Sequence, residues 1–127
     1  MARIRTVKPA LFSSRTVSTY TDAEFRVFVG LFCYVDDDGR GEDDADLIKA
    51  DVAPRIKRIG ARAIDTHLDR FADKTRDPSG TPPICRYTVD GLACFHFVNW
   101  HDHQRINRPT KSKLPPCPIH EPEGLFP

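Results

Sequence analysis

A basic, hydrogen-bonding segment over residues 98–115 carries the clearest chemical signal in the chain. It places four cations against one acid, Asp102, among amide, hydroxyl and imidazole side chains. Arginine and lysine replace the counterions condensed on a sugar-phosphate backbone, while amides and hydroxyls bond phosphate oxygens. A solvated surface tail is the alternative for any isolated basic run. The candidate DNA contacts in this segment are Gln104, Arg105, Asn107, Arg108, Lys111 and Lys113.

The remaining charges are also segregated along the chain, behind a net charge of only +1. Residues 1–15 carry four cations and no acid, whereas residues 36–51 carry eight acids and two cations. Residues 55–76 are basic again, with seven cations against three acids. Because the local field steers a charged partner, both basic segments are candidate DNA contacts. These further candidates are Arg3, Arg5, Lys8, Arg55, Lys57, Arg58, Arg62 and Thr66.

Four residues late in the chain are potential zinc ligands. They are His101, His103, Cys117 and His120, and the Cys-x-x-His spacing of the last pair is acceptable for a zinc knuckle. His-x-His is a weak half-motif, however, and short Cys/His patterns often arise by accident. We therefore expect no metal and no other cofactor, with the first two histidines acting as polar groups near Trp100 or as phosphate donors. The four cysteines contain no Cys-x-x-Cys pair and are expected to be free thiols.

The sequence lacks the usual motifs of catalysis. The acidic run from residue 36 does not fit a calcium loop, because the position that needs a bidentate acid falls on Leu47. There is no glycine-rich phosphate loop, nucleophile elbow or His-Glu-x-x-His motif. Cys94 and His96 share one face of a predicted strand, as a nucleophile and its base would, but a core cysteine beside a partly buried histidine explains them better. We predict that the protein is not an enzyme.

Hydrophobic periodicity predicts two helices in the first half of the chain. The first has Asp22 as its N-cap and ends at the turn over residues 36–39, where Gly39 would take the left-handed C-cap conformation. Residues 40–42 are expected to be short and extended. A second helix, capped by the acid at position 43 or 44, runs to about residue 52 with Leu47 and Ile48 facing inward.

A third helix and a hairpin are predicted in the second half. Residues 60–74 place Ile64, Leu68 and Phe71 on one face of a helix and the basic residues on the opposite face. The dipeptide Asp90-Gly91 between two apolar runs, residues 84–89 and 92–100, is a strong hairpin signal.

The order helix, short strand, helix, helix, hairpin is that of a winged helix-turn-helix fold, in the α+β class. In that fold the third helix enters the major groove of DNA and the hairpin forms the wing. We predict a basic N-terminal arm over residues 1–21, a winged-helix domain over 22–100 and a basic, proline-rich C-terminal arm over 101–127. Both arms are expected to be extended, with no regular structure after Trp100 and with disorder from Pro115 onward unless something holds the chain.

Several stretches resemble a family of phage proteins. The matching residues are 3–9, 30–45, 47–50, 98–101, 104–109 and 112–115. That family carries the winged-helix N-terminal domain of phage replication initiators or replisome organisers, related in architecture to DnaD-type domains, and its members are commonly described as helix-turn-helix DNA-binding proteins. The resemblance implies a winged helix that binds duplex DNA. The third helix matches least well, because the family usually has an acidic, alanine-rich helix where this sequence is basic.

We therefore predict a phage-encoded protein that binds double-stranded DNA in the host cytoplasm, in replication or transcriptional control. Replication proteins of this type continue into a second domain, so the resemblance favours DNA binding over initiation. The alternative is a protein-interaction module that targets a host protein through residues 36–51, and a small metal-dependent nuclease is a distant third. No membrane partner is expected, because no apolar run could span a bilayer and the start lacks the apolar stretch of a signal peptide. One winged helix reads few bases, so a homodimer or a tandem site would supply specificity.

Overall fold

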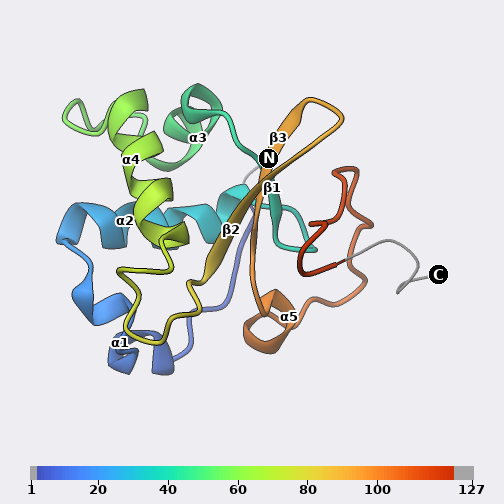
Figure 1. Ribbon diagram of the computed structural model, residues 1–127, viewed down its shortest axis with the longest axis horizontal. Coiled ribbons are helices and arrows are strands. Elements are labelled where there is room, and N and C mark those ends of the chain that lie inside the picture. Colours follow the sequence, from blue (N-terminus) through green and yellow to red (C-terminus); the bar gives the residue numbers. More distant parts are fainter. Residues whose placement is uncertain (1–2, 122–127) are drawn as a thin grey trace.

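The computed structural model describes residues 3–121 and belongs to the α+β class. The helices α2, α3 and α4 lie on one side of the hairpin, and the C-terminal segment lies on the other (Figure 1). In chain order the elements are α1 (Ala10–Ser13), the 3-10 turn η1 (Val17–Thr19), α2 (Asp22–Tyr34), β1 (Arg40–Glu42), α3 (Ala45–Val52), α4 (Ala61–Ala72), β2 (Ile84–Val89), β3 (Leu92–Phe97) and α5 (Trp100–His103).

Helix α2 begins with a capping box. The Oγ1 of Thr21 accepts a hydrogen bond from the Glu24 amide at 3.1 Å, and the Glu24 carboxylate accepts one from the Thr21 amide at 2.8 Å. The predicted N-cap at Asp22 is therefore wrong by one residue. Thr21 is extended and satisfies the free amide, whereas Asp22 lies in the first turn, where its charge favours the helix dipole.

Gly39 belongs to the turn after α2 and is not its C-cap, which corrects the prediction. The helix ends at Tyr34, and the residue that follows it, Val35, is extended. Gly39 has a φ of +78°, and a Cβ at this position would lie 2.6 Å from the Trp100 ring. Both the backbone conformation and the close approach of the indole therefore require glycine.

Helix α3 agrees with its predicted bounds. Asp44 is the N-cap, and its carboxylate accepts hydrogen bonds from two amides of the first turn. Ile48 is fully buried, but Leu47 is 47% exposed, so the prediction that both face inward is half wrong. Neighbouring residues on a helix point about 100° apart, and so short a helix buries only one narrow stripe.

Helix α4 buries the predicted stripe of Ile64, Leu68 and Phe71, each of which has no exposed surface. It ends at Ala72, two residues before the predicted end at residue 74. Asp73 is extended, and its carboxylate accepts hydrogen bonds from the amide and hydroxyl of Thr75. This local turn competes with the helix for the backbone.

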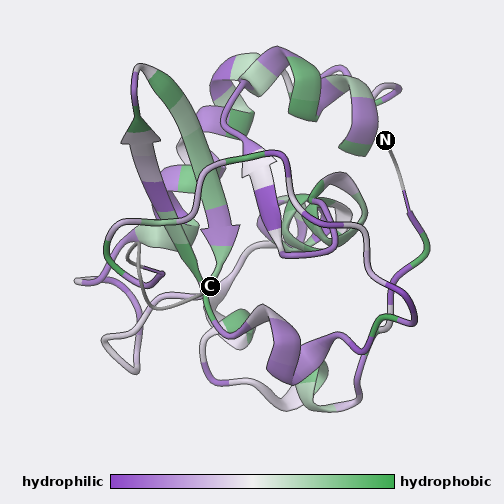
Figure 2. Cartoon of the chain, turned by 90° about the vertical axis from the view of Figure 1, so that its right-hand side faces the viewer, coloured by the Kyte–Doolittle hydropathy of each residue, from purple (hydrophilic) through white to green (hydrophobic). Residues whose placement is uncertain are grey.

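The antiparallel sheet has the strand order β1–β3–β2, and the predicted Asp-Gly hairpin joins β2 to β3. Asp90 and Gly91 have φ values of 51° and 81°, and Val89 pairs with Leu92 across the turn. Hydrophobic and hydrophilic residues are mixed along the hairpin (Figure 2). Strand β3 ends at Phe97, and a short helix, α5, begins at Trp100, so the prediction of no regular structure after that residue was wrong. Asn99, with a φ of 65°, redirects the chain between the two elements.

An aromatic cluster joins the helices to the sheet. The ring of Phe28 in α2 lies 5.2–5.6 Å, between centroids, from the rings of Tyr20, Phe32, Phe71 and Phe97. These residues come from α2, α4, β3 and the segment after η1. These rings belong to the main core cluster, which holds α4 against both α2 and the sheet.

The terminal segments of the described chain pack against the rest of the molecule, so the predicted extended arms are not observed. The Arg3 amide donates to the Cys33 carbonyl at 3.2 Å, which fixes the N-terminal segment beside α2. We call residues 104–121 the C-terminal strap. The Tyr87 hydroxyl of β2 donates to the Pro115 carbonyl at 2.6 Å, so the strap remains ordered where disorder was expected. Residues 122–127 lie outside the described chain.

Candidate nucleic-acid interface

Four of the predicted DNA contacts gather around the start of α4. Arg55, Lys57, Arg58 and Arg62 are all exposed, and among residues 3–121 none of their side chains forms an ion pair. Gly60, the N-cap, offers no side chain to the first amides of the helix. A helix start with free amides carries a partial positive charge that adds to the four cations. We call this set the α4 patch.

The next turns of α4 are different in charge. Thr66 is exposed, and its hydroxyl donates to the Arg62 carbonyl at 3.0 Å. On the side facing the hairpin, Arg86 of β2 contacts the carboxylates of Asp65 at 2.7 Å and Asp69 at 2.6 Å. It also contacts Asp43 at 2.7 Å. The positive surface of α4 is therefore confined to its first turns.

Arg86 was not identified from the sequence. Hydrogen bonds from its guanidinium, mainly to Asp43 and to a smaller extent to Asp65, raise its pKa above the ordinary arginine value. A lone basic residue in an apolar strand gives no signal by itself. Its role follows only from the packing of α4 against β2, which brings carboxylates from two other segments to one guanidinium.

The strap displays a second group of predicted contacts. Arg105, Asn107, Arg108, Lys111 and Lys113 are exposed, and no hydrogen bond or ion pair forms at their side chains within the described part of the chain. Their backbone is fixed, because the amides of Thr110 and Ser112 donate to the carboxylates of Asp37 and Asp38. These cations therefore project from an anchored segment and not from a free arm.

The two positive groups face different directions. In Figure 1 the α3–α4 turn lies to the left of the hairpin and the strap to its right, and in Figure 2 the strap crosses the face nearest the viewer. A ligand bound at the α4 patch would therefore face away from the strap. The sequence could not show this separation, because it follows from the position of the hairpin between the two groups.

The predicted N-terminal contacts at Arg3, Arg5 and Lys8, and Gln104, all form interactions within the molecule. Arg5 has a side chain only 4% exposed, and it contacts Asp37 at 3.0 Å. Arg3 contacts the same carboxylate at 3.0 Å, and Lys8 donates to the Asp102 carbonyl at 2.7 Å. Gln104 is buried and exchanges two hydrogen bonds with the backbone of Thr6. Arg5 and Gln104 are therefore removed from the predicted DNA contacts, since neither presents its polar group to a ligand.

The acidic turn over residues 36–38 is the partner of these segments. Asp37 is 2% exposed, and the Thr110 amide, together with the guanidinium groups of Arg5 and Arg3, holds its pKa below the ordinary value. Asp36 accepts hydrogen bonds from the amides of Asp38 and Arg40. Many carboxylates of the acidic segment therefore form hydrogen bonds or ion pairs within the molecule. This leaves fewer free carboxylates for the alternative function of docking on a host protein.

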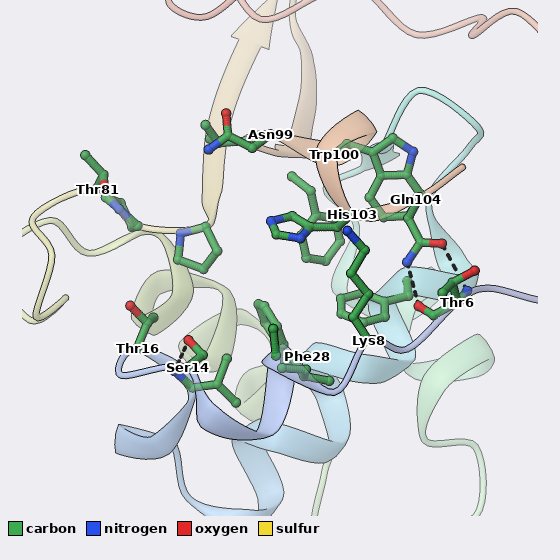
Figure 3. Close-up of a pocket in the computed structure, with 18 residues that line it drawn as sticks. Thr6, Lys8, Ser14, Thr16, Phe28, Thr81, Asn99, Trp100, His103 and Gln104 are labelled. Carbon is green, nitrogen blue, oxygen red and sulfur yellow. Dashed lines mark hydrogen bonds between the residues drawn. The ribbon is translucent and has the colours of Figure 1, made fainter. Parts of the chain in front are cut away.

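A recess of about 260 Å³ lies between the N-terminal segment and α5 (Figure 3). Its lining is largely apolar and includes Phe28 and Trp100. Lys8 and His103 are the ionisable residues of this lining, which contains no carboxylate and no thiol. The recess therefore offers neither a carboxylate base nor a thiol nucleophile, and the expectation that the protein is not an enzyme stays a prediction.

The structure brings together a different set of potential metal ligands from the set predicted from the sequence. His101 and His103 are exposed and stand apart from Cys117 and His120, which instead meet Cys85 and His96. Burial lowers the pKa of His96 to about 4, so its ring is neutral near pH 7. The His96 ring faces His120, so the interpretation of Cys94 and His96 as nucleophile and base, which the sequence already disfavoured, gains no support.

Among residues 3–121 no helix combines the length and the apolar character needed to cross a membrane. No protein-family model, curated protein or solved structure matches the chain.

Proposed function

We propose that this protein binds double-stranded DNA as a winged helix-turn-helix protein. In this assignment α3 and α4 form the helix-turn-helix pair, α4 enters the major groove and the β2–β3 hairpin is the wing. The proposal is supported by the order of the elements and by the packing of α4 against both α3 and the hairpin.

The observation that carries the proposal is the α4 patch. Its four cations are exposed and unpaired within the described chain, and they surround the free amides of a helix start. Phosphate oxygens are well matched to this arrangement, because cations and helix N-termini both favour negative charge. Arg58 and Arg62, in or next to the first turn of α4, are the residues we assign to base edges or flanking phosphates in the major groove.

In this proposal the hairpin fits against the DNA through its shape, and no positive charge at its tip attracts the phosphates. Its tip, residues 88–93, contains no lysine or arginine and carries Asp90. We therefore assign no phosphate contact to the wing. Asp90 instead limits how closely the tip approaches the DNA backbone, since like charges repel.

The strap is assigned to a second, weaker contact with the DNA backbone. Because it faces away from α4, its cations reach only DNA that continues beyond the docked segment or bends around the molecule. Such contacts neutralise phosphates and carry no sequence information.

The biological setting that we propose follows from the resemblance to phage winged-helix proteins. In this setting the protein is encoded by a phage, binds DNA and acts in replication or transcriptional control in the cytoplasm of the host. The residues behind this resemblance include the Asp-Asp-Asp-Gly turn and the strap, which the structure joins through hydrogen bonds of Thr110 and Ser112.

Duplex binding at low salt tests the proposal. Wild-type protein and the double variant Arg58→Ala/Arg62→Ala are titrated into a labelled duplex of about two helical turns, with anisotropy as the readout. Arg15→Ala is the matched control, because Arg15 is exposed and lies between α1 and η1, at the opposite end of the molecule from the α3–α4 turn. We expect the double variant to lose most of its affinity and the control to bind like wild type. Equal binding by all three proteins would overturn the assignment of α4.

A further inference from the structure

Four side chains of the types that bind zinc meet on the outer side of the hairpin. Cys85 of β2 and His96 of β3 are directly paired across the two strands, so their side chains lie on the same face of the sheet. Cys117 and His120 approach this face from the strap. One donor atom from each residue can be chosen so that all four lie within 4.8 Å of one another.

Three of the six distances between these donor atoms match those of a tetrahedron around one zinc ion, and the other three are no longer than 4.8 Å. Bonds of about 2.3 Å to sulfur and about 2.05 Å to nitrogen place two sulfurs about 3.8 Å apart, sulfur and nitrogen about 3.6 Å apart, and two nitrogens about 3.3 Å apart. The Sγ atoms of Cys85 and Cys117 are 3.8 Å apart. The Cys117 Sγ lies 3.5 Å from His120 Nδ1, which lies 3.2 Å from His96 Nε2.

A disulfide does not describe the same geometry. The sulfur separation of 3.8 Å is far longer than a disulfide bond of about 2.05 Å. A disulfide would also not explain why one ring nitrogen of each histidine, Nε2 of His96 and Nδ1 of His120, lies within the cluster. The four residues combine a strand pair with a Cys-x-x-His segment, which is a ligand set found in structural zinc sites.

A carboxylate lies behind one donor of the cluster. The other ring nitrogen of His96, Nδ1, lies 3.7 Å from the Glu121 carboxylate, and Arg40 holds that carboxylate at 2.9 Å. A carboxylate behind a ligating histidine fixes the ring orientation and raises the basicity of the donor nitrogen. Cys117 is fully buried and His96 is 4% exposed, so these two donors are shielded from water, whereas Cys85 is half-buried and His120 is exposed.

A metal would add to the hydrogen bonds that hold the strap. Apart from the buried Cys117, its larger apolar side chains are half-buried or exposed, as Leu114 and Ile119 are. A segment with so little apolar burial gains little hydrophobic stabilisation. A metal bound by residues of both the hairpin and the strap would join them, because metal-binding free energy adds directly to folding free energy.

We propose that Cys85, His96, Cys117 and His120 bind one structural zinc ion that fastens the strap to the hairpin. Four protein donors fill the tetrahedron and leave no open position for a substrate, which assigns the ion a structural role. The proposal replaces the expectation of a metal-free protein. That expectation considered only the ligands near the end of the sequence and could not foresee that a strand pair would supply the other two.

Metal content and cobalt spectra test the site. Protein without a histidine tag is prepared under reducing conditions, and its zinc content is measured. Cobalt is then titrated into the metal-free protein. We expect one zinc per chain, a thiolate-to-cobalt charge-transfer band and ligand-field bands of tetrahedral intensity. Cys117→Ser should lose the stoichiometric zinc and weaken the charge-transfer band. Glu121→Gln, which alters the group behind His96, should weaken zinc affinity by about 10–100-fold.

Two controls separate this site from other metal-binding arrangements. His101→Asn/His103→Asn removes the histidines of the sequence-based ligand set, and Cys33→Ser removes a thiol outside the cluster; both should retain wild-type zinc content. Because Cys117→Ser could fail to fold, wild-type melting is also measured with and without chelator, and a chelator-induced fall in the melting temperature is expected. The proposal is overturned if metal-replete medium yields no zinc, if cobalt gives only octahedral spectra, or if thiol counting shows a disulfide between Cys85 and Cys117.

Discussion

Asp37 joins three parts of the chain through one buried carboxylate. This carboxylate accepts hydrogen bonds from the Arg3 and Arg5 guanidinium groups of the N-terminal segment and from the Thr110 amide of the strap. Its carbonyl also accepts the Trp100 indole N–H at 2.9 Å. The conformation of the acidic turn therefore determines where both terminal segments lie.

Replacing Asp37 with asparagine should destabilise the protein by on the order of 3 kcal/mol, because the buried Arg5 guanidinium would lose its counter-charge. Urea unfolding at pH 7 measures this free energy, and Asp51→Asn, an exposed aspartate of α3, is the control. Equal stability of Asp37→Asn and wild type would show that the Asp37 carboxylate does not stabilise the fold.

The same carboxylate predicts how stability depends on pH. The pKa of Asp37 is lowered in the folded protein, chiefly by the Thr110 amide, from an ordinary value of 3.8. Its contribution is therefore present above pH 3.8 and is lost as the pH falls through the lower folded value. Unfolding free energies measured as the pH falls below about 5 should decline more steeply for wild type than for Asp37→Asn. Parallel pH profiles would contradict this.

Trp100 is the other residue on which the strap depends, and it is the only tryptophan. It is 4% exposed, and the centroid of its ring lies 6.4 Å from that of Phe32 in α2. Trp100→Ala should cost on the order of 3 kcal/mol. Trp100→Phe should cost less, since it keeps most of the apolar packing and removes mainly the indole hydrogen bond. Fluorescence of the wild type should be blue-shifted, and emission like that of free tryptophan in water would contradict the burial.

At the scale of elements, the hairpin turn requires positive φ at both central residues. Gly91 has a φ of 81°, and a Cβ at this position would meet no atom within 4 Å, so strain and not crowding opposes substitution. Gly91→Val should destabilise the protein by about 1–2 kcal/mol or more, whereas Gly91→Asn should be tolerated better because asparagine adopts this conformation more readily. Thermal melts compare the two, and identical melting of Gly91→Val and wild type would mean that the turn is assigned incorrectly.

The elements that could be predicted from the sequence are those with local signals. The Asp44 cap, the α4 stripe and the Asp-Gly turn each depend on neighbouring residues, and all three are confirmed. The course of the terminal segments depends on interactions across long sequence separations, such as that of Gln104 with Thr6. Polarity suggested solvent and phosphate as the partners of these segments, whereas the acidic turn over residues 36–38 provides partners inside the molecule.

For the whole molecule, the proposal that both the α4 patch and the strap contact DNA predicts that the affinity depends on the length of the duplex. Arg105→Ala/Arg108→Ala should scarcely affect binding to a duplex of about one helical turn, which docks on α4 alone. On a duplex of about three turns the same variant should bind several-fold more weakly than wild type, since its strap no longer neutralises flanking phosphates. Anisotropy titrations with both lengths measure the ratio. A weakening of the same size on the short duplex would place the strap in the primary interface.

The salt dependence of duplex binding tests the central claim most directly. The logarithm of the binding constant is measured against the logarithm of salt concentration for wild type, for Arg58→Ala/Arg62→Ala and for the control Arg15→Ala. If the α4 patch neutralises phosphates, the slope of the double variant should be shallower than that of wild type by about one for each phosphate that is no longer neutralised, while the control keeps the wild-type slope. Unchanged slopes together with unchanged affinity at low salt would contradict DNA binding through α4.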